Sequence, residues 1–380
     1  MHQGVMRGIK TTALAGGLAG LAAALLAAPT ALASTVTIAG GNTVRVAETG
    51  NEANQITVGY DAVGDVYRVG DAAATLTPNG ACVMVDAHSA TCPGAGITSV
   101  SVATGDRDDS IALDTATIPG TITESLDAGS ANDTISGANT PGTLTGGSGN
   151  DRISGRGTLN GGSGNDTITG SPLADNLRGS SGRDTFDGGF GADDISGGSG
   201  TDALGYPGRP SGVNVTIGSG SSNDGGPEDQ TGSRRDNVHG DVEVLFGTEL
   251  PDVLVGDHSS ETLIGLAGDD LIAGNSGADT VLGYDGNDLL IGESGNDLLR
   301  GGPGADRQYG KSGNDRLAGG PDDDFLRGGT GHDVMKGKNG TDRINARDGR
   351  RDVKISCGPG PNGLEKAKWD KRRDPRPKSC

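Results

Sequence analysis

Aspartate recurs every nine residues through the second half of this 380-residue sequence. Gly283–Ile291 and Gly292–Arg300 are two such units placed directly one after the other. Continued in both directions, the frame has eleven slots, of which ten hold aspartate and one holds Glu261. An earlier series has the same spacing, interrupted by one step of fifteen residues between Asp151 and Asp166. Carboxylates are hard oxygen ligands, so their regular repetition indicates a series of metal sites.

The candidate metal ligands are the aspartates at the sixth position of each unit. In the earlier block they are Asp133, Asp151, Asp166, Asp175, Asp184, Asp193 and Asp202. In the later block they are Asp252, Asp270, Asp279, Asp288, Asp297, Asp306, Asp315, Asp324, Asp333 and Asp342.

An apolar residue follows two positions after almost every one of these aspartates. The glycine-rich six residues of a unit predict a turn, since glycine reaches backbone angles closed to other residues. The last three residues predict a short strand whose middle side chain points inward. The inward positions are Ile135, Ile153, Ile168, Leu177, Phe186, Ile195 and Leu204, then every ninth residue from Leu254 to Ile344, with Gln308 as the polar exception.

The unit Gly161–Thr169, Gly-Gly-Ser-Gly-Asn-Asp-Thr-Ile-Thr, resembles the nonapeptide of the RTX, or haemolysin-type, calcium-binding proteins that bacteria secrete. The resemblance implies an all-β fold, a parallel β-roll or β-solenoid in which two nonapeptides form one coil of eighteen residues. Turns n and n+2 would stack with calcium between them, held by carboxylates and main-chain carbonyls. The implied files are Asp252, Asp270, Asp288, Asp306, Asp324 and Asp342, and opposite them Asp279, Asp297, Asp315 and Asp333; in the earlier block Asp133 would face Asp151, Asp166 would face Asp184 and Asp202, and Asp175 would face Asp193.

Calcium fits these turns better than other cations do. Calcium accepts six to eight oxygen ligands in loose geometry, whereas magnesium demands a tight octahedron. Zinc or copper would require histidine or cysteine, which these turns lack apart from His332 and the outlying His258. Aspartate also caps ordinary turns, but capping explains one or two turns and not a shared period.

Composition favours folding that depends on the cation. The chain has 71 glycines, 32% hydrophobic residues and a formal net charge of -19, a combination typical of disorder. Stacking the acidic turns without a cation brings like charges together, so binding and folding should be one event.

The sequence divides into six segments. Residues 1–33 predict a signal peptide cleaved after Ala33, because Arg7 and Lys10 precede an apolar stretch that ends at Ala31-Leu32-Ala33. This apolar stretch is too short for a membrane span, so we expect a secreted, extracellular protein without a transmembrane anchor. The remaining segments are an amino-terminal β cap (34–125), the two repeat blocks (126–206 and 247–345), an insertion (207–246) and a basic carboxy-terminal cap or tail (346–380).

Four cysteines allow three pairings, and in an oxidising compartment the local pairs are favoured. Cys82 with Cys92 would close the amino-terminal cap, and Cys357 with Cys380 would close the tail. Thr35–Ile38 and Ser99–Val102 alternate in polarity and predict strands in that cap.

The insertion and the tail have alternative interpretations. Gly212–Ile217 predicts a strand, and the insertion is either a loop beside the coil or a substrate-facing segment. After Ala346 eleven Lys and Arg stand against five Asp and Glu, so the tail either caps the solenoid or binds an anionic cell-wall or surface polymer. Nucleic acid is not expected, since the tail has one aromatic residue, Trp369, and no recognised fold for that purpose.

We expect no enzyme. The sequence has neither a His-Glu-x-x-His motif nor a nucleophile elbow, and its histidines are scattered. The predicted function is secreted calcium binding; the alternatives are a calcium-rigidified adhesin or polysaccharide-binding module and, behind it, a polysaccharide-modifying enzyme that uses paired carboxylates.

Overall fold

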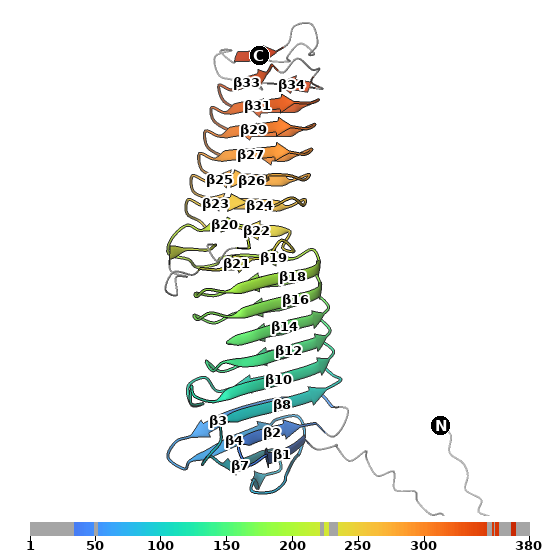
Figure 1. Ribbon diagram of the computed structural model, residues 1–380, viewed down its shortest axis with the longest axis vertical. Coiled ribbons are helices and arrows are strands. Elements are labelled where there is room, and N and C mark those ends of the chain that lie inside the picture. Colours follow the sequence, from blue (N-terminus) through green and yellow to red (C-terminus); the bar gives the residue numbers. More distant parts are fainter. Residues whose placement is uncertain are drawn as a thin grey trace, which may run out of the picture. The chain divides into compact units, whose positions relative to one another are not determined.

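The computed structural model describes residues 34–48, 52–220, 224–227, 235–347, 352, 354–356 and 366–369. These residues form strands and turns with no α-helix, and the chain winds into a parallel β-solenoid of about 12 turns, which confirms the predicted fold. Figure 1 shows the strands stacked one coil above another. No helix among the described residues is long and apolar enough to cross a membrane.

Three sheets contain the strands, and within each sheet neighbouring strands pair in the order that follows. Sheet A contains β5 (Leu76–Pro78), β1 (Ser34–Ala39), β2 (Thr43–Ala47), β8 (Ser99–Gly105), β10 (Thr123–Ser130), β12 (Gly142–Ser148), β14 (Gly157–Ser163), β16 (Asn176–Gly182), β18 (Asp194–Gly200) and β21 (Asn237–Val238). Sheet B contains β6 (Val83–Asp86), β7 (Ser89–Pro93), β4 (Val66–Asp71), β3 (Gln55–Asp61), β9 (Ser110–Leu113), β11 (Thr134–Ser136), β13 (Arg152–Ser154), β15 (Thr167–Thr169), β17 (Thr185–Asp187), β19 (Ala203–Leu204), β22 (Val244–Phe246), β24 (Thr262–Ala267), β26 (Thr280–Asp285), β28 (Leu298–Arg300), β30 (Arg316–Gly320), β32 (Val334–Lys338) and β34 (Lys354–Ser356). Sheet C contains β20 (Asn214–Thr216), β23 (Val253–Val255), β25 (Leu271–Ala273), β27 (Leu289–Ser294), β29 (Arg307–Ser312), β31 (Phe325–Thr330), β33 (Arg343–Ala346) and β35 (Lys366–Trp369).

The core is a ladder of single apolar side chains, one from each nonapeptide. Leu254 pairs with Ile272 and Leu290 with Gln308, eighteen residues apart in both cases. All the predicted inward residues are buried, and so is the polar exception Gln308. One aliphatic layer per nonapeptide is a thin core, so the turns must contribute much of the stability.

The amino-terminal region departs from the parallel pattern. β1 pairs antiparallel with β2 and parallel with β5, and β3 pairs antiparallel with β4. The continuous parallel stacking starts where β2 pairs with β8 and β3 pairs with β9. The predicted disulfide between Cys82 and Cys92 is present. Cys357, Cys380 and the predicted signal peptide lie outside the described residues.

The solenoid changes sheets inside the segment 207–246. Sheet A ends at β21, and sheet C begins at β20, while sheet B continues from β19 through β22 to β24. In Figure 1 the strands of sheet C follow those of sheet A along the viewed side. The predicted strand in Gly212–Ile217 is present as β20. The segment thus supplies strands to all three sheets rather than only a loop beside them.

Candidate metal centre in the stacked turns

The sixth-position aspartates lie inside the turns and link successive coils. Asp297 is 1% exposed, and its Oδ1 accepts the backbone N–H of Asp279 at 3.0 Å. The N–H of Asp297 donates in turn to Oδ1 of Asp315 at 3.0 Å. In each of these carboxylates, one oxygen therefore accepts a hydrogen bond from the backbone of the preceding coil.

These bonds join every pair predicted from the sequence. One file runs from Asp252 through Asp270, Asp288, Asp306 and Asp324 to Asp342. The opposite file runs from Asp279 through Asp297 and Asp315 to Asp333. In the earlier block the bonds join Asp133 to Asp151, Asp166 to Asp184, Asp184 to Asp202, and Asp175 to Asp193.

The second oxygen of most of these carboxylates is buried and receives no hydrogen bond. This holds among the described residues for Oδ2 of Asp133, Asp151, Asp166, Asp184, Asp202, Asp270, Asp279, Asp288, Asp297, Asp306, Asp315 and Asp324. Asp175 and Asp252 differ, because their Oδ2 atoms accept the N–H of Ser171 and of Thr248, respectively, each at 2.6 Å. A buried anionic oxygen without a partner is costly, so these atoms identify positions where a cation would be stabilised.

The first glycine of each turn makes room for that oxygen. A Cβ placed on Gly283 would overlap Oδ2 of Asp288, and one on Gly292 would overlap Oδ2 of Asp297. The fourth position also requires glycine: Gly295 has a φ of 148° and packs against the carbonyl oxygen of Gly277 in the preceding coil. Carboxylate and carbonyl oxygens are thereby brought to the stacked turns without side chains between them.

Burial raises the pKa of these carboxyl groups. It raises the pKa of Asp270, Asp306, Asp315 and Asp324 to about 7, and neighbouring aspartates add to the shift. The same cause raises the pKa of Glu261, in the altered slot, to about 8. Near neutral pH the ionised form of these carboxyl groups is therefore disfavoured by desolvation.

Several acids outside the predicted set continue the files. Asp109, in a faint copy of the repeat, accepts the N–H of Asn54 at 2.6 Å and donates its own N–H to Asp133 at 2.7 Å. Asp151 donates to Oδ1 of Asp166 at 2.8 Å, although only fifteen residues separate them. Beyond Asp333 the file reaches Asp352.

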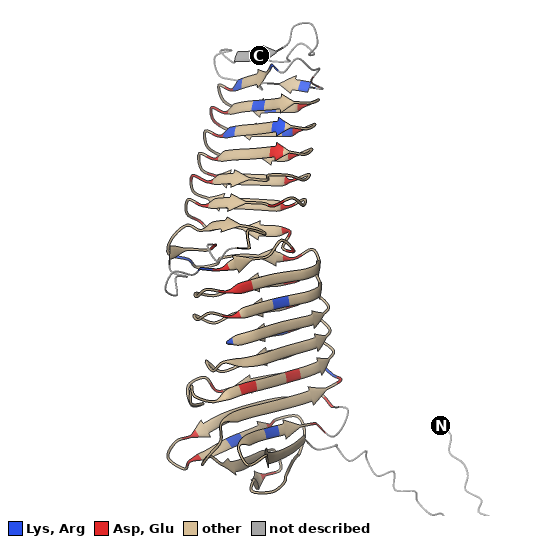
Figure 2. Cartoon of the chain, viewed as in Figure 1, with Lys and Arg blue, Asp and Glu red and all other residues tan. Residues whose placement is uncertain are grey.

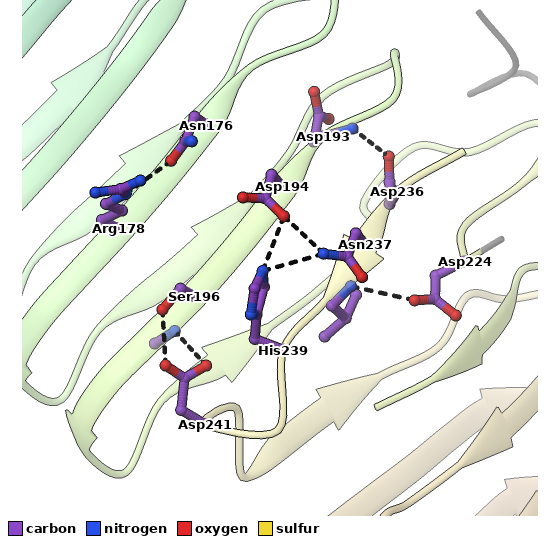
Figure 3. A network of polar contacts seen from close by, with 12 residues as sticks. Asn176, Arg178, Asp193, Asp194, Ser196, Asp224, Asp236, Asn237, His239 and Asp241 are labelled. Carbon is purple, nitrogen blue, oxygen red and sulfur yellow. Dashed lines mark hydrogen bonds and ion pairs between the residues drawn. The ribbon is translucent and has the colours of Figure 1, made fainter. Parts of the chain in front are cut away.

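The segment 207–246 supplies two further acids to the files. Asp236 accepts the N–H of Asp193 at 3.0 Å, and Glu243 accepts the N–H of Asp202 at 2.8 Å. Figure 3 shows Asp236 beside Asp193, and next to them Asp194, which accepts hydrogen bonds from Asn237 at 2.7 Å and from His239 at 2.8 Å. Asp236 stands 43 residues from its partner and Glu243 stands 41, so no nine-residue frame could identify them.

The donor set fits calcium rather than a softer metal. Among the described residues no group of three or more His, Cys, Asp or Glu side chains is placed to hold a metal ion. An ion in these turns would therefore need backbone carbonyls beside each carboxylate, which is an all-oxygen site of the kind calcium accepts. Magnesium, zinc and copper are poor matches for such a site.

Comparison with protein families agrees with the geometry. The model described as RTX calcium-binding nonapeptide repeat (4 copies) matches residues 120–153, 136–168, 154–172, 169–204, 255–290, 274–308, 282–317 and 309–344. No curated protein matches the chain as a relative.

Proposed function

Since this chain belongs to the RTX calcium-binding nonapeptide-repeat proteins, we propose that it is an exported scaffold whose coils fold when calcium enters the stacked turns. The proposed ligands are the seventeen sixth-position aspartates together with main-chain carbonyls of the turns. Calcium would neutralise carboxylates that the fold buries in files.

The buried, unbonded Oδ2 atoms carry this proposal. Each file places carboxylates on successive coils, and in most of them, such as Asp297 and Asp315, the backbone uses only one oxygen. Ionised carboxylates in that position repel one another and are poorly solvated, whereas a divalent cation reverses the sign of the interaction. The thin core cannot easily offset the repulsion, so the calcium-free chain should be largely unfolded at neutral pH.

Export supplies the calcium in this proposal. Extracellular calcium modules commonly bind with dissociation constants of ~10⁻⁴ to 10⁻³ M, so such a chain would stay loose until it reaches a calcium-rich compartment. Cleavage after Ala33 and passage through an oxidising compartment fit with the Cys82–Cys92 disulfide. We assign no catalytic role to the buried acids, because their oxygens are engaged in the ladder or enclosed by the turns.

The test is a calcium titration of the chain from residue 34 onward, which contains every described residue. Circular dichroism should show β structure appearing with calcium, and calorimetry should show several ions bound in the same concentration range. Magnesium at equal concentration is the control and should give little β structure. Equal β content and equal melting temperature in excess chelator and in millimolar calcium would contradict the proposal.

A polymer-binding role is the second candidate function. The sequence placed such a contact in the basic tail or in the segment 207–246, and most of the tail lies outside the described residues. The described part of the molecule offers a different surface for it, on sheet C.

A further inference from the structure

The outward positions of sheet C change character along the solenoid. On β23, β25 and β27 the outward slots hold the aliphatic residues Val253, Val255, Leu271, Ala273, Leu289 and Ile291. On β29, β31 and β33 the same slots hold Arg307, Tyr309, Phe325, Arg327, Arg343 and Asn345. The strands β23, β25 and β27 form the same kind of coil with aliphatic residues at these positions. Neither the coil nor the turns therefore require arginine or aromatic residues there.

We call Arg307, Tyr309, Phe325, Arg327 and Arg343 the arginine–aromatic face. Strand register aligns Arg307, Phe325 and Arg343 in one row, and Tyr309 with Arg327 in the next. Adjacent strands lie about 4.8 Å apart, so the two arginines of the first row are separated by roughly 10 Å of backbone. Figure 2 shows basic residues on β29 and β31, next to an acidic residue on β27 and following the strands β23 and β25, which are uncharged.

The aromatic rings divide this face into two grooves. Tyr309 and Phe325 have ring centroids 5.7 Å apart. A groove of about 500 Å³ is lined by Arg307, Arg343, both rings, the exposed acid Asp323 and the proposed calcium ligands Asp306 and Asp324. A second groove, of about 410 Å³, lies on the other side of Tyr309 and is lined by Arg327 and Lys311 among others.

The three arginines of the face have no acidic partner among the described residues. Arg307, Arg327 and Arg343 are exposed and form no ion pair with another described residue, whereas Lys311 is paired with Glu293 at 3.4 Å. Arg327 is the diagonal neighbour of Arg307 and of Arg343 across adjacent strands, within reach of long side chains, so the three guanidinium groups together favour an external anion.

We propose that the arginine–aromatic face binds an anionic polysaccharide, with the arginines donating to its carboxylate or sulfate groups and the rings of Tyr309 and Phe325 packing on sugar rings. Asp323 favours a sugar over a polyphosphate, because its carboxylate can accept hydrogen bonds from the hydroxyl groups that a sugar carries and a polyphosphate lacks. The inference rests on the proposed function, since the strands align these residues only in the folded, calcium-loaded coil.

The experiment compares two variants with the same loss of charge in the same coils. Arg307→Gln, Arg327→Gln and Arg343→Gln together remove the cations of the face. The control combines Arg300→Gln, Arg316→Gln and Lys336→Gln, three exposed cations on β28, β30 and β32 of sheet B. Binding to hyaluronan, chondroitin sulfate, neutral dextran and an oligothymidylate is measured by calorimetry in millimolar calcium at about 0.1 M salt, where exposed charges still act over about 10 Å.

We expect the unmodified chain to bind at least one of the two anionic polysaccharides and not dextran. The sheet C variant should bind at least tenfold more weakly, and the sheet B variant within twofold of the unmodified chain. Tyr309→Leu, which keeps every charge, should also weaken binding severalfold, and it decides the case if the triple variant fails to fold. Calcium-induced β structure is recorded for each protein, so a chain that folds with calcium but binds no polysaccharide refutes this inference alone. Equal losses in both triple variants, or tighter binding of the oligothymidylate, would also overturn it.

Discussion

Replacing Asp315 with asparagine should have opposite effects with and without calcium. Asp315 is 1% exposed, its Oδ1 accepts the N–H of Asp297 at 3.0 Å, and its Oδ2 has no described partner. An asparagine keeps the acceptor Oδ1 and removes the charge. The variant therefore separates the hydrogen bond that links the coils from the charge that would bind calcium.

The magnitude follows from the pKa of this carboxyl group. Burial raises it from 3.8 to about 7, and one unit corresponds to about 1.4 kcal/mol, which gives an upper limit of about 4 kcal/mol for the ionised form. Screening by solvent near the turn reduces that figure, and the buried amide NH₂ of the variant costs about 1 to 3 kcal/mol. A net stabilisation of about 1 kcal/mol is left for the calcium-free fold at pH 8.

With calcium the sign reverses, because the variant lacks one carboxylate ligand. A site that is saturated at one hundred times its dissociation constant stabilises the fold by about 2.7 kcal/mol, and most of this would be lost. We expect the melting temperature in millimolar calcium to fall by about 3 to 8 °C.

The assay without calcium uses chelator at pH 8 with enough trimethylamine N-oxide to keep half of the unmodified chain folded. If the substitution stabilises the calcium-free fold by about 1 kcal/mol, the folded fraction measured by the β signal rises from one half to about 85%. Asp323→Asn is the matched control: Asp323 is exposed, and its Oδ1 accepts the N–H of Thr341 at 2.7 Å, a bond that asparagine can keep. A variant at 315 that loses β signal equally in chelator and in calcium would refute the reasoning.

Two further predictions concern acid and the turn glycines. The folded pKa of Asp270, Asp306 and Asp324 lies near 7, above the ordinary 3.8, so the stability of the calcium-free fold is fully present below about pH 4 and is lost as pH rises through 7. Circular dichroism in chelator should accordingly show more β structure at pH 5 than at pH 8, and the opposite trend would contradict the burial of these carboxyl groups. Gly283→Ala places a Cβ on Oδ2 of Asp288 and 2.8 Å from its Cγ, so we expect about one calcium fewer in calorimetry and a melting temperature lower by several degrees. Gly120→Ala, with nothing within 4 Å of the added Cβ, is its control, and equal results for the two would argue against a built site at that turn.

The coil and its core could be predicted because both follow from short-range pattern. A glycine-rich turn, a carboxylate and one inward apolar residue recur at fixed spacing, and Phe186 and Met335 are buried in the slots that the frame assigns to them. The acids contributed by the segment 207–246 could not be predicted. Asp236 and Glu243 reach their positions through strand pairing across an irregular segment, and that distance has no period.

The arginine–aromatic face has a weaker signal in the sequence than the turns do. Arg307, Phe325 and Arg343 are spaced eighteen residues apart, which is the period of one whole coil rather than of one nonapeptide. Successive nonapeptides contribute strands to different sheets. The outward residues of one sheet can therefore be recognised in the sequence only when every second nonapeptide is compared. The cations of the tail are easier to recognise because they are close together in the chain.

The segment 207–246 makes the two repeat blocks one folding unit rather than two. Leu204 on β19 pairs with Leu245 on β22, which pairs with Leu263 on β24, so the inward ladder of sheet B is unbroken. Glu243 occupies the place of the missing aspartate after Asp202. In a solenoid each coil is stabilised chiefly by its neighbours, so a continuous ladder transmits order between blocks whereas a flexible linker would not. Calcium bound in the earlier block should therefore favour the ordering of the later one, even though sheet A ends where sheet C begins.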